Sequence, residues 1–324
     1  MFEHIYCAPM EGVTRAVFRQ AHHDLFGGCD SYITPFLAPS ADGVFSEKEL
    51  REVLPEACAG VPTVPQLLTA RPEHFFWAAE NMAELGYRQV DLNLGCPSGT
   101  VVAKHKGSGM LADPEALDRF FDAVFGAMPA GMTLSVKTRI GLEDKNNWPA
   151  LLAVFDRYPI ALLTVHPRLR RQFYKGRPDM EAFLTALEQV RLPLCYNGDI
   201  FTAEDARAIR QRFPGVEHIM LGRGLVANPA LAREIRGGTP LTGAELRQFH
   251  DRVLEAYCAC ILGEVNILHK MKELWNYWAC LFPEEKKGVK ALRKSRNLAE
   301  YRRTAQAVLA AEPAKNGGYI PQSL

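Results

Sequence analysis

Eight short apolar runs, separated by stretches of helical periodicity, restrict the fold of this chain more than any other feature. Most of the runs are apolar at both alternate positions, which is typical of parallel strands covered on each face. They span residues 4–9, 30–35, 63–68, 89–94, 133–138, 161–166, 193–198 and 218–223. Strands that alternate with helices in this way predict an α/β fold, a (β/α)8 TIM barrel.

The stretches between these runs carry helix-boundary residues. Pro stands near the start of 71–86 and Gly at its end, while Asp113 and Thr202 are suited to cap the helices expected over 113–128 and 202–213. The alternative to a barrel is a doubly wound open sheet. The absence of a GxGxxG motif after the first run argues against that alternative.

The strand pattern stops near residues 236–243, and only helical stretches follow. We therefore expect two domains, a TIM-barrel catalytic domain over residues 1–238 and a helical bundle over 239–324. The change of periodicity, from 2 to 3.6 residues, is the physical basis for this boundary.

Composition and charge exclude several classes of protein. The 324 residues are 48% hydrophobic and carry a net charge of +1, so no global field points to an acidic partner. The 8 cysteines form no CxxC pair, and we expect no metal site. No apolar stretch reaches the ~18 residues of a membrane span, and the N-terminal residues lack the character of a signal or transit peptide. A cytoplasmic protein with reduced thiols, no membrane partner and a monomeric state is expected.

Polar or conformationally special residues stand where most of the predicted strands end. In a TIM barrel the carboxyl ends of the strands form one face, where active sites lie. The sequence therefore predicts a ring of functional side chains at that face, contributed by Pro9, Met10, Glu11, Gln66, Asn93, Cys96, Lys137, Arg139, His166, Asn197, Gly198, Asp199, Gly222 and Arg223.

The last two strands are followed by Asn-Gly-Asp and Gly-Arg-Gly. Loops of this kind expose backbone N–H groups, and barrels often bind a phosphate there with the help of a helix N-terminus. We expect that helix to begin at Asn228. The glycines could equally serve only to form turns, and the spacing alone does not separate these alternatives.

Cys96 follows a glycine and precedes a proline, and the polar stretch 97–109 comes next. This context favours an exposed thiol on a flexible loop. With an ordinary pKa of about 8.5 the thiol would be protonated at neutral pH and able to donate a proton. The alternative is a small core side chain, as for most free cysteines and as we expect for Cys7 and Cys195.

Lys137 and His166 each have two interpretations. The lysine ends a strand with apolar neighbours, so it would either offset the negative charge of a ligand or extend along the barrel rim into water. The histidine would either contact a cofactor or form satisfied hydrogen bonds within the structure.

These residues belong to segments that resemble the dihydrouridine synthases, flavin enzymes that reduce uridine in RNA. The motif segments run in order from residue 8 to about 230, and the one around Cys96 is the most specific. They are 8–14, 91–115, 136–141, 166–179, 197–200 and 221–229. The helical tail resembles the family in type but only weakly in sequence. Pro35 and Pro167 depart from the family pattern, which leaves the subfamily open.

The resemblance implies a barrel that holds FMN, with NADPH as reductant, and a helical domain that binds RNA, most often tRNA. The predicted FMN contacts are Pro9, Met10, Glu11, Gln66, Lys137, His166, Asn197, Gly198, Asp199, Gly222 and Arg223. By the same resemblance, Asn93 and Arg139 would face the target base. Cys96 would be the general acid that protonates C5 of the uracil after hydride reaches C6. The uridine would have to leave its stack, as in other enzymes that modify bases.

The local distribution of charge agrees with an RNA partner. Residues 168–177 carry five basic and no acidic residues, and residues 270–303 carry ten basic and four acidic residues, with Trp275, Tyr277 and Trp278 among them. We expect phosphate contacts from these segments and from the loop after Cys96, made by Lys104, Arg171, Lys270 and Lys272. Solvated helix faces over an aromatic core are the alternative. The same barrel could also belong to a flavoenzyme that reduces a small molecule, or to an RNA-binding protein without catalytic activity.

Overall fold

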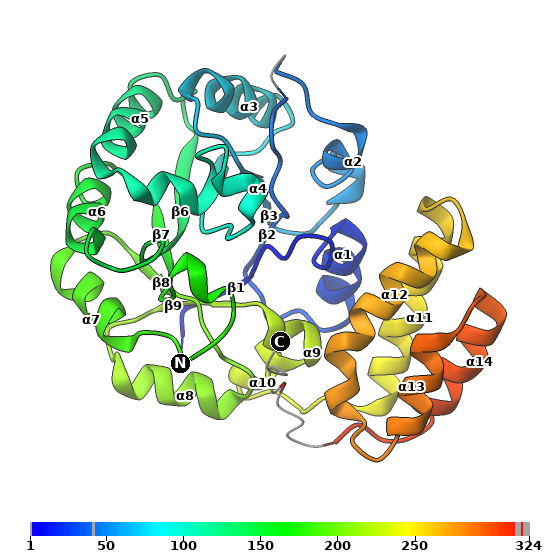
Figure 1. Ribbon diagram of the computed structural model, residues 1–324. Helices are drawn as coiled ribbons and strands as arrows, with labels where there is room; N and C mark the ends of the chain where they lie inside the picture. Colours follow the sequence, from blue (N-terminus) through cyan, green and yellow to red (C-terminus); the bar gives the residue numbers. More distant parts are fainter. Residues whose placement is uncertain (1, 41–42, 315–318, 320–324) are drawn as a thin grey trace.

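A computed structural model describes residues 2–40, 43–314 and 319 of the chain. Figure 1 shows a ring of strands surrounded by helices, with a group of helices packed beside it. The strands are β1 (His4–Cys7), β2 (Ser31–Ile33), β3 (Thr63–Val64), β4 (Gln66–Leu67), β5 (Gln89–Leu94), β6 (Thr133–Arg139), β7 (Leu162–His166), β8 (Leu194–Tyr196) and β9 (His218–Leu221). The helices of the barrel are α1 (Ala16–Leu25), α2 (Glu47–Leu50), α3 (Pro72–Glu84), α4 (Gly99–Val102), α5 (Pro114–Gly126), α6 (Trp148–Phe155), α7 (Met180–Gln189) and α8 (Ala203–Arg212).

All strand pairs are parallel, in the order β3-β2-β1-β9-β8-β7-β6-β5-β4. The expected TIM barrel is confirmed. The single strand expected over 63–68 is wrong in detail, because it is divided at Pro65 into β3, which pairs with β2, and β4, which pairs with β5. Proline has no N–H to give to a strand ladder, so the ladder changes partner there. Since β3 and β4 stand at the two ends of this order and are joined through Pro65, they bring the two edges of the sheet together.

Helix starts in the barrel follow the capping residues expected from the sequence. The side chain of Asp113 accepts a hydrogen bond from Ala116 N at the start of α5, and Thr202 forms a capping box with Asp205 at the start of α8. Such caps satisfy backbone N–H groups that have no partner within the helix. They also fix where each loop on the carboxyl face of the barrel ends.

The segment after β9 differs from the expectation. A short helix, α9 (Arg223–Ala227), begins directly after Gly222, and Asn228 is its C-cap rather than the start of a helix. The next helix, α10, spans Leu231–Ile235. Gly224 allows α9 to lie against the loop after β8, because a Cβ at this position would lie 2.1 Å from the carbonyl oxygen of Ile200. The close approach of the two loops therefore depends on glycine.

The remaining helices pack against one side of the barrel (Figure 1). They are α11 (Gly243–Cys260), α12 (Glu264–Trp278), α13 (Lys286–Lys294) and α14 (Leu298–Leu309). Phe18 of α1 and Val226 of α9 share an apolar core with these helices, and Trp278 Nε1 donates a hydrogen bond to Val226 O over 2.9 Å. This core joins the helices to the barrel. Trp275 and Trp278 are fully buried in it, which agrees with the alternative of an aromatic core beneath a solvated helix face.

Candidate active site

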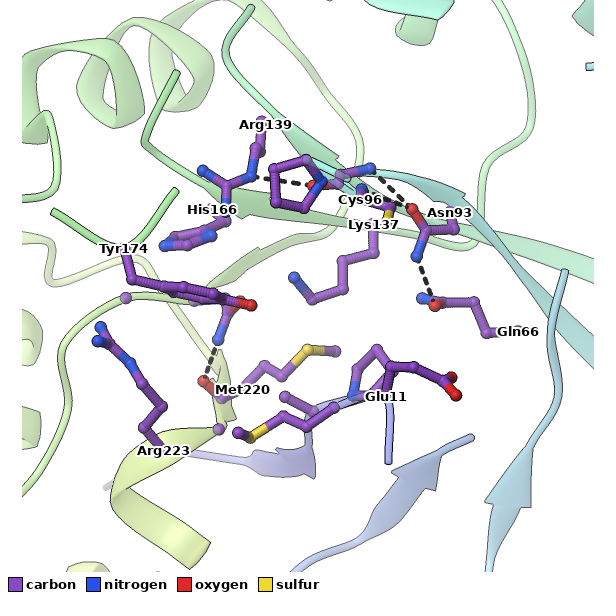
Figure 2. Close-up of a pocket in the computed structure, with 18 of the residues that line it drawn as sticks. Glu11, Gln66, Asn93, Cys96, Lys137, Arg139, His166, Tyr174, Met220 and Arg223 are labelled. Carbon is purple, nitrogen blue, oxygen red and sulfur yellow. Dashed lines mark hydrogen bonds between the residues drawn. The ribbon is translucent and has the colours of Figure 1, made fainter. Parts of the chain in front are cut away.

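The carboxyl ends of the strands surround an open pocket (Figure 2). Its walls come from the loops after β1, β5, β8 and β9 and from side chains of β4, β6 and β7. Of the predicted site residues, the pocket brings together Pro9, Met10, Glu11, Gln66, Asn93, Cys96, Lys137, Arg139, His166, Asn197, Gly198, Asp199, Gly222 and Arg223. Parallel strands deliver these residues, although they are far apart in sequence, to one face.

Lys137 extends from β6 into the pocket (Figure 2). Burial lowers the pKa of its ammonium to about 8, with the nearby Arg139 charge acting in the same direction. Within the described part of the chain, no hydrogen bond or ion pair joins Nζ to another residue. A cation without a partner inside a partly buried pocket favours an anionic or electron-rich ligand.

Cys96 lies in the turn after β5 and is half-buried. Its N–H donates to Asn93 Oδ1 over 2.8 Å, and its carbonyl oxygen accepts from Ser108 Oγ over 2.7 Å. Burial raises the pKa of the thiol, which keeps it protonated at neutral pH. A side chain with a proton to give therefore stands at the pocket wall.

The segment after Cys96 contains helical turns that its composition did not predict. It contains α4 and a 3₁₀ helix over Gly107–Ala112, and Gly107–Leu111 are buried. A Cβ at Gly107 would lie 3.0 Å from Cys96 Cβ, so glycine permits the segment to fold back over the cysteine. Lys104 lies on its exposed side.

Arg139 lines the pocket as expected, but its guanidinium is used by the protein itself. It donates to the carbonyl oxygens of Gly95, Leu169 and Phe173 over 2.9, 3.0 and 2.8 Å. The side chain is buried, and burial lowers its pKa to about 10. Arg139 thus ties the Cys96 turn to the loop after β7 instead of pointing freely at a ligand.

Arg168 does not line the pocket but holds two residues that do, and sequence reasoning missed it. It is fully buried, and it donates to His166 Nε2 over 3.0 Å and to Asp199 Oδ2 over 2.5 Å. Because a guanidinium only donates, His166 must accept through Nε2 and carry its proton on Nδ1. Burial and the surrounding cations lower the pKa of His166 well below its ordinary value, so the ring is neutral. The position of Arg168, two residues after His166 and on the same side of the chain, was the sequence signal that could have identified it.

Asp199 also accepts from Arg223 over 2.7 Å, so one carboxylate lies between two arginines. Tyr174, a second missed residue, lines the pocket with its ring 4.9 Å from the Arg223 guanidinium and 5.7 Å from that of Arg139. The sequence interpretation counted only the charges of residues 168–177. The adjacent pair Phe173 and Tyr174, both exposed, was the signal in that segment.

The remaining predicted RNA contacts do not line the pocket. Arg171 is exposed, as Lys104 is. Lys270 Nζ donates to Gly12 O and Glu273 Oε2, both over 3.1 Å, and Lys272 Nζ donates to Ser295 O. The two α12 lysines therefore already have hydrogen-bond partners within the protein, on different sides of the helix, and their role as phosphate contacts stays a prediction.

Cys7 and Cys195 are fully buried, as expected for core side chains. Among the described residues, no group of three or more His, Cys, Asp or Glu side chains is arranged to hold a metal ion. No helix in the described ranges has the length and apolar character needed to cross a membrane.

Comparison with known proteins gives a consistent family assignment. A family model described as "Dihydrouridine synthase (Dus)" matches residues 6–316. A tRNA-dihydrouridine(16) synthase of Ralstonia nicotianae is 34% identical over 71% of this chain and 72% of its own. Proteins of the same name from Neisseria meningitidis and Pseudomonas putida are 28% and 31% identical, over 87% and 76% of this chain and 86% and 77% of theirs.

Solved structures support the fold. A variant of NCR from Zymomonas mobilis aligns with a TM-score of 0.50 at 16% identity, over 74% of this chain and 91% of its own. A morphinone reductase mutant in complex with tetrahydroNAD aligns with a TM-score of 0.52 at 14% identity, over 73% of this chain and 87% of its own. At these identities the likeness concerns the barrel fold alone.

Asp199→Asn is expected to destabilise the protein by removing the anion between Arg168 and Arg223. Breaking a buried ion pair by removing one partner costs about 3–5 kcal/mol, and we expect about 2–3 kcal/mol because Asp199 is partly exposed. Asparagine tolerates the positive φ of 45° at this position. The free energy of unfolding is measured by urea denaturation.

The matched control is Glu143→Gln, which breaks the exposed 3.6 Å pair with Arg170 and should change the free energy of unfolding by less than about 1 kcal/mol. Equal effects of the two substitutions would contradict a structural role for the Asp199 cluster.

Proposed function

The chain belongs to the dihydrouridine synthase family, whose enzymes reduce uridine to dihydrouridine, and from that premise we propose a specific substrate, cofactor and proton donor. The substrate is tRNA, the cofactor is FMN reduced by NADPH, and the proton donor is Cys96. One observation carries the proposal: the unpartnered ammonium of Lys137 and the protonated thiol of Cys96 line the same pocket.

The pocket residues suit the two ends of a flavin nucleotide. The Lys137 ammonium is available to an electron-rich ring, and the neutral His166 can donate through Nδ1. FMN bound here would supply hydride to C6 of the uracil. The wall around the ring is proposed to be completed by other pocket residues at the strand ends, namely Pro9, Met10, Glu11, Gln66 and Asn197.

The phosphate of FMN is proposed to lie between the loops after β8 and β9. The first backbone N–H groups of α9 have no partner within the helix, and they follow Gly222 directly. Arg223 adds a charged donor, with one nitrogen held by Asp199. Gly198, in the opposite loop, leaves room for the Tyr196 hydroxyl, since a Cβ there would lie 3.1 Å from Tyr196 Oη. These features support the phosphate alternative over simple turns.

Cys96 is proposed to act as the general acid. Its Sγ–H bond breaks as a C–H bond forms at C5 of the uracil, and the thiolate that remains is reprotonated from solvent. The raised pKa of the thiol suits this direction of transfer, since the group holds its proton until charge develops on the base. Lys137 would stabilise negative charge on the ligand side of the pocket.

The RNA is proposed to meet a basic and aromatic rim around the pocket. Lys104 and Arg171 are exposed on the segments after β5 and β7, and the rings of Phe173 and Tyr174 are exposed beside Arg171. Such rings stack on bases, while the cations contact phosphates. Asn93 lines the pocket from β5, where the target base would enter.

The helical domain over 239–324 is proposed to extend the RNA-binding surface beyond the barrel domain over 1–238. The sequence of α13 holds five basic residues and no acidic one, and its lysines are exposed while Val289 and Leu292 are buried. Because Lys270 and Lys272 already have hydrogen-bond partners within the protein, α13 is proposed as the main phosphate-facing helix. Binding through phosphates should weaken steeply with added salt.

The names of the relatives favour uridine 16 of tRNA as the target. A protein that acts on tRNA in this way would work as a cytoplasmic enzyme. The second candidate, a barrel enzyme that reduces a small molecule, would use the same pocket but would not need the exposed rim cations. Incubation of the purified protein with NADPH and unmodified tRNA separates the two: dihydrouridine must appear at position 16, and its absence would contradict the proposal.

Cys96→Ala should retain FMN and NADPH oxidation but lose about 10²-fold or more in uridine reduction, the scale for a positioned general acid. Dihydrouridine formation is followed by mass spectrometry of tRNA. The wild-type rate should fall at alkaline pH, where Lys137, with its pKa lowered to about 8, loses its charge before the thiol, whose pKa is raised, loses its proton. Cys260→Ala, at an exposed thiol outside the pocket, is the control and should behave as wild type. Near-normal activity of C96A would assign the proton to another donor.

Lys137→Met should weaken FMN binding by about 10- to 100-fold, since a hydrogen bond to a charged group contributes about 1.5–3 kcal/mol. Flavin content and fluorescence titration give the dissociation constant. Lys104→Met, which removes an exposed lysine away from the pocket, should leave flavin binding unchanged. Equal flavin affinity of K137M and wild type would refute the role of Lys137.

A further inference from the structure

A buried carboxylate lies below the pocket, outside the roles described above. Asp91 of β5 stands opposite Gln66 of β4 and Ser135 of β6 in the parallel register. Only 1% of its surface is exposed. Its Oδ2 accepts from Gln66 Nε2 over 2.8 Å, and its Oδ1 accepts from Ser135 Oγ over 2.7 Å. Both carboxylate oxygens are therefore satisfied, and one of them contacts a pocket residue.

The hydrogen bonds continue from Gln66 to the turn that holds the cysteine. Gln66 Oε1 accepts from Asn93 Nδ2 over 2.7 Å, a contact visible in Figure 2. Asn93 Oδ1 then accepts from the backbone N–H groups of Gly95 and Cys96, over 3.0 and 2.8 Å. An unbroken series of hydrogen bonds thus joins the carboxylate of Asp91 to the backbone of Cys96.

The two ends of this series give it one direction: the backbone N–H groups of Gly95 and Cys96 only donate, and the ionised carboxylate of Asp91 only accepts. Gln66 must therefore turn its nitrogen toward Asp91 and its oxygen toward Asn93. Asn93 must then turn its nitrogen toward Gln66, which leaves its oxygen for the two backbone N–H groups. If either amide were reversed, two donors or two acceptors would meet, and each buried group left unpaired costs about 1–3 kcal/mol.

We propose that Asp91 is a positioning residue, which orients the amides of Gln66 and Asn93 so that the turn at Gly95 and Cys96 holds the thiol toward the substrate. The inference rests on the proposed role of Cys96 and adds to it. Asp91 does not touch the pocket, so it acts only through other side chains. The same strand register also places Asn93 opposite Lys137.

The negative charge of Asp91 also acts on Lys137, and an experiment must separate this effect from the orientation of the amides. Burial raises the pKa of Asp91 to about 6, while the hydrogen bonds from Gln66 and Ser135 and the Lys137 charge oppose that rise. The carboxyl is ionised at pH 7, and its charge favours the protonated form of Lys137. Loss of activity on substitution of Asp91 could therefore come from the missing negative charge or from a changed orientation of the Gln66 and Asn93 amides.

The pair Asp91→Asn and Asp91→Leu separates the two effects, because both remove the charge. In D91N the new side-chain oxygen can accept from Gln66 while its nitrogen donates to Ser135 Oγ, since a hydroxyl can accept as well as donate. The direction of the series is kept. D91L has a similar volume but no acceptor, so Gln66 Nε2 loses its partner and the Gln66 amide is no longer held toward Asn93. If D91L does not fold, D91A takes its place in the comparison.

We expect kcat for uridine reduction to fall roughly 10- to 100-fold further in D91L than in D91N, the scale for misplacement of a catalytic group. KM for tRNA should be alike in the two variants. Hydrogen exchange of the peptide that contains Gly95 and Cys96 should be slow in wild type and D91N and faster in D91L. Equal kcat and equal exchange in D91N and D91L, or fast exchange of these amides in the wild type, would overturn the proposal.

The exchange measurement does not depend on the reaction. If C96A keeps full activity while exchange still separates D91L from D91N, the general-acid assignment fails and the positioning of the turn stands. If C96A is inactive and the two Asp91 variants are alike in both measurements, the proposed function stands and the role of Asp91 fails.

Discussion

The parallel register of β4, β5 and β6 is the constraint on which the site depends. It places Gln66, Asp91 and Ser135 in one layer and Asn93 and Lys137 in the next, nearer the carboxyl face. A shift of one residue in any of these strands would turn its side chains from the barrel interior to the helices outside. The positions of Cys96, of the unpartnered Lys137 ammonium and of the amides beside them thus depend on the pairing that also closes the sheet.

An excess of positive charge distinguishes the pocket from an ordinary barrel end. Lys137, Arg139, Arg168 and Arg223 lie in or beside it, whereas Asp199 is the carboxylate that pairs with two of them. Most of these cations are neutralised or engaged by the protein, and Lys137 is the exception. A buried cation is costly unless a ligand compensates it, so the pocket is suited to bind an electron-rich or anionic molecule. The proposed binding of flavin and RNA depends on this charge distribution.

The sequence predicted the barrel and most of the pocket because both depend on local periodicity. Residues at strand ends, such as Lys137 and His166, could be placed at one face once the strands were identified. The break at Pro65 and the start of α9 at Arg223 were missed, since they depend on which neighbour each segment meets in space. Arg168 was missed for the same reason, because its partners are 2 and 31 residues away.

The tryptophans of α12 show the limit of reasoning from composition. A helix with basic residues and aromatics is compatible with an RNA-binding face or with a core under a solvated face, and only the packing of α12 against α9 and α11 decides between them. Asp91 illustrates the opposite case. Its position two residues before Asn93 already implied a shared face, but the hydrogen-bond series that gives it a role requires three strands in register.

The central claim, reduction of a tRNA uridine, is tested most directly by mapping dihydrouridine in tRNA from cells that lack this gene. The same tRNA is then treated with the purified wild-type protein and NADPH, and mass spectrometry locates the product. The account predicts loss of dihydrouridine at position 16 in the cells and its restoration by the protein. Unchanged dihydrouridine in the cells, together with no product from unmodified tRNA and the flavin-loaded protein, would contradict it.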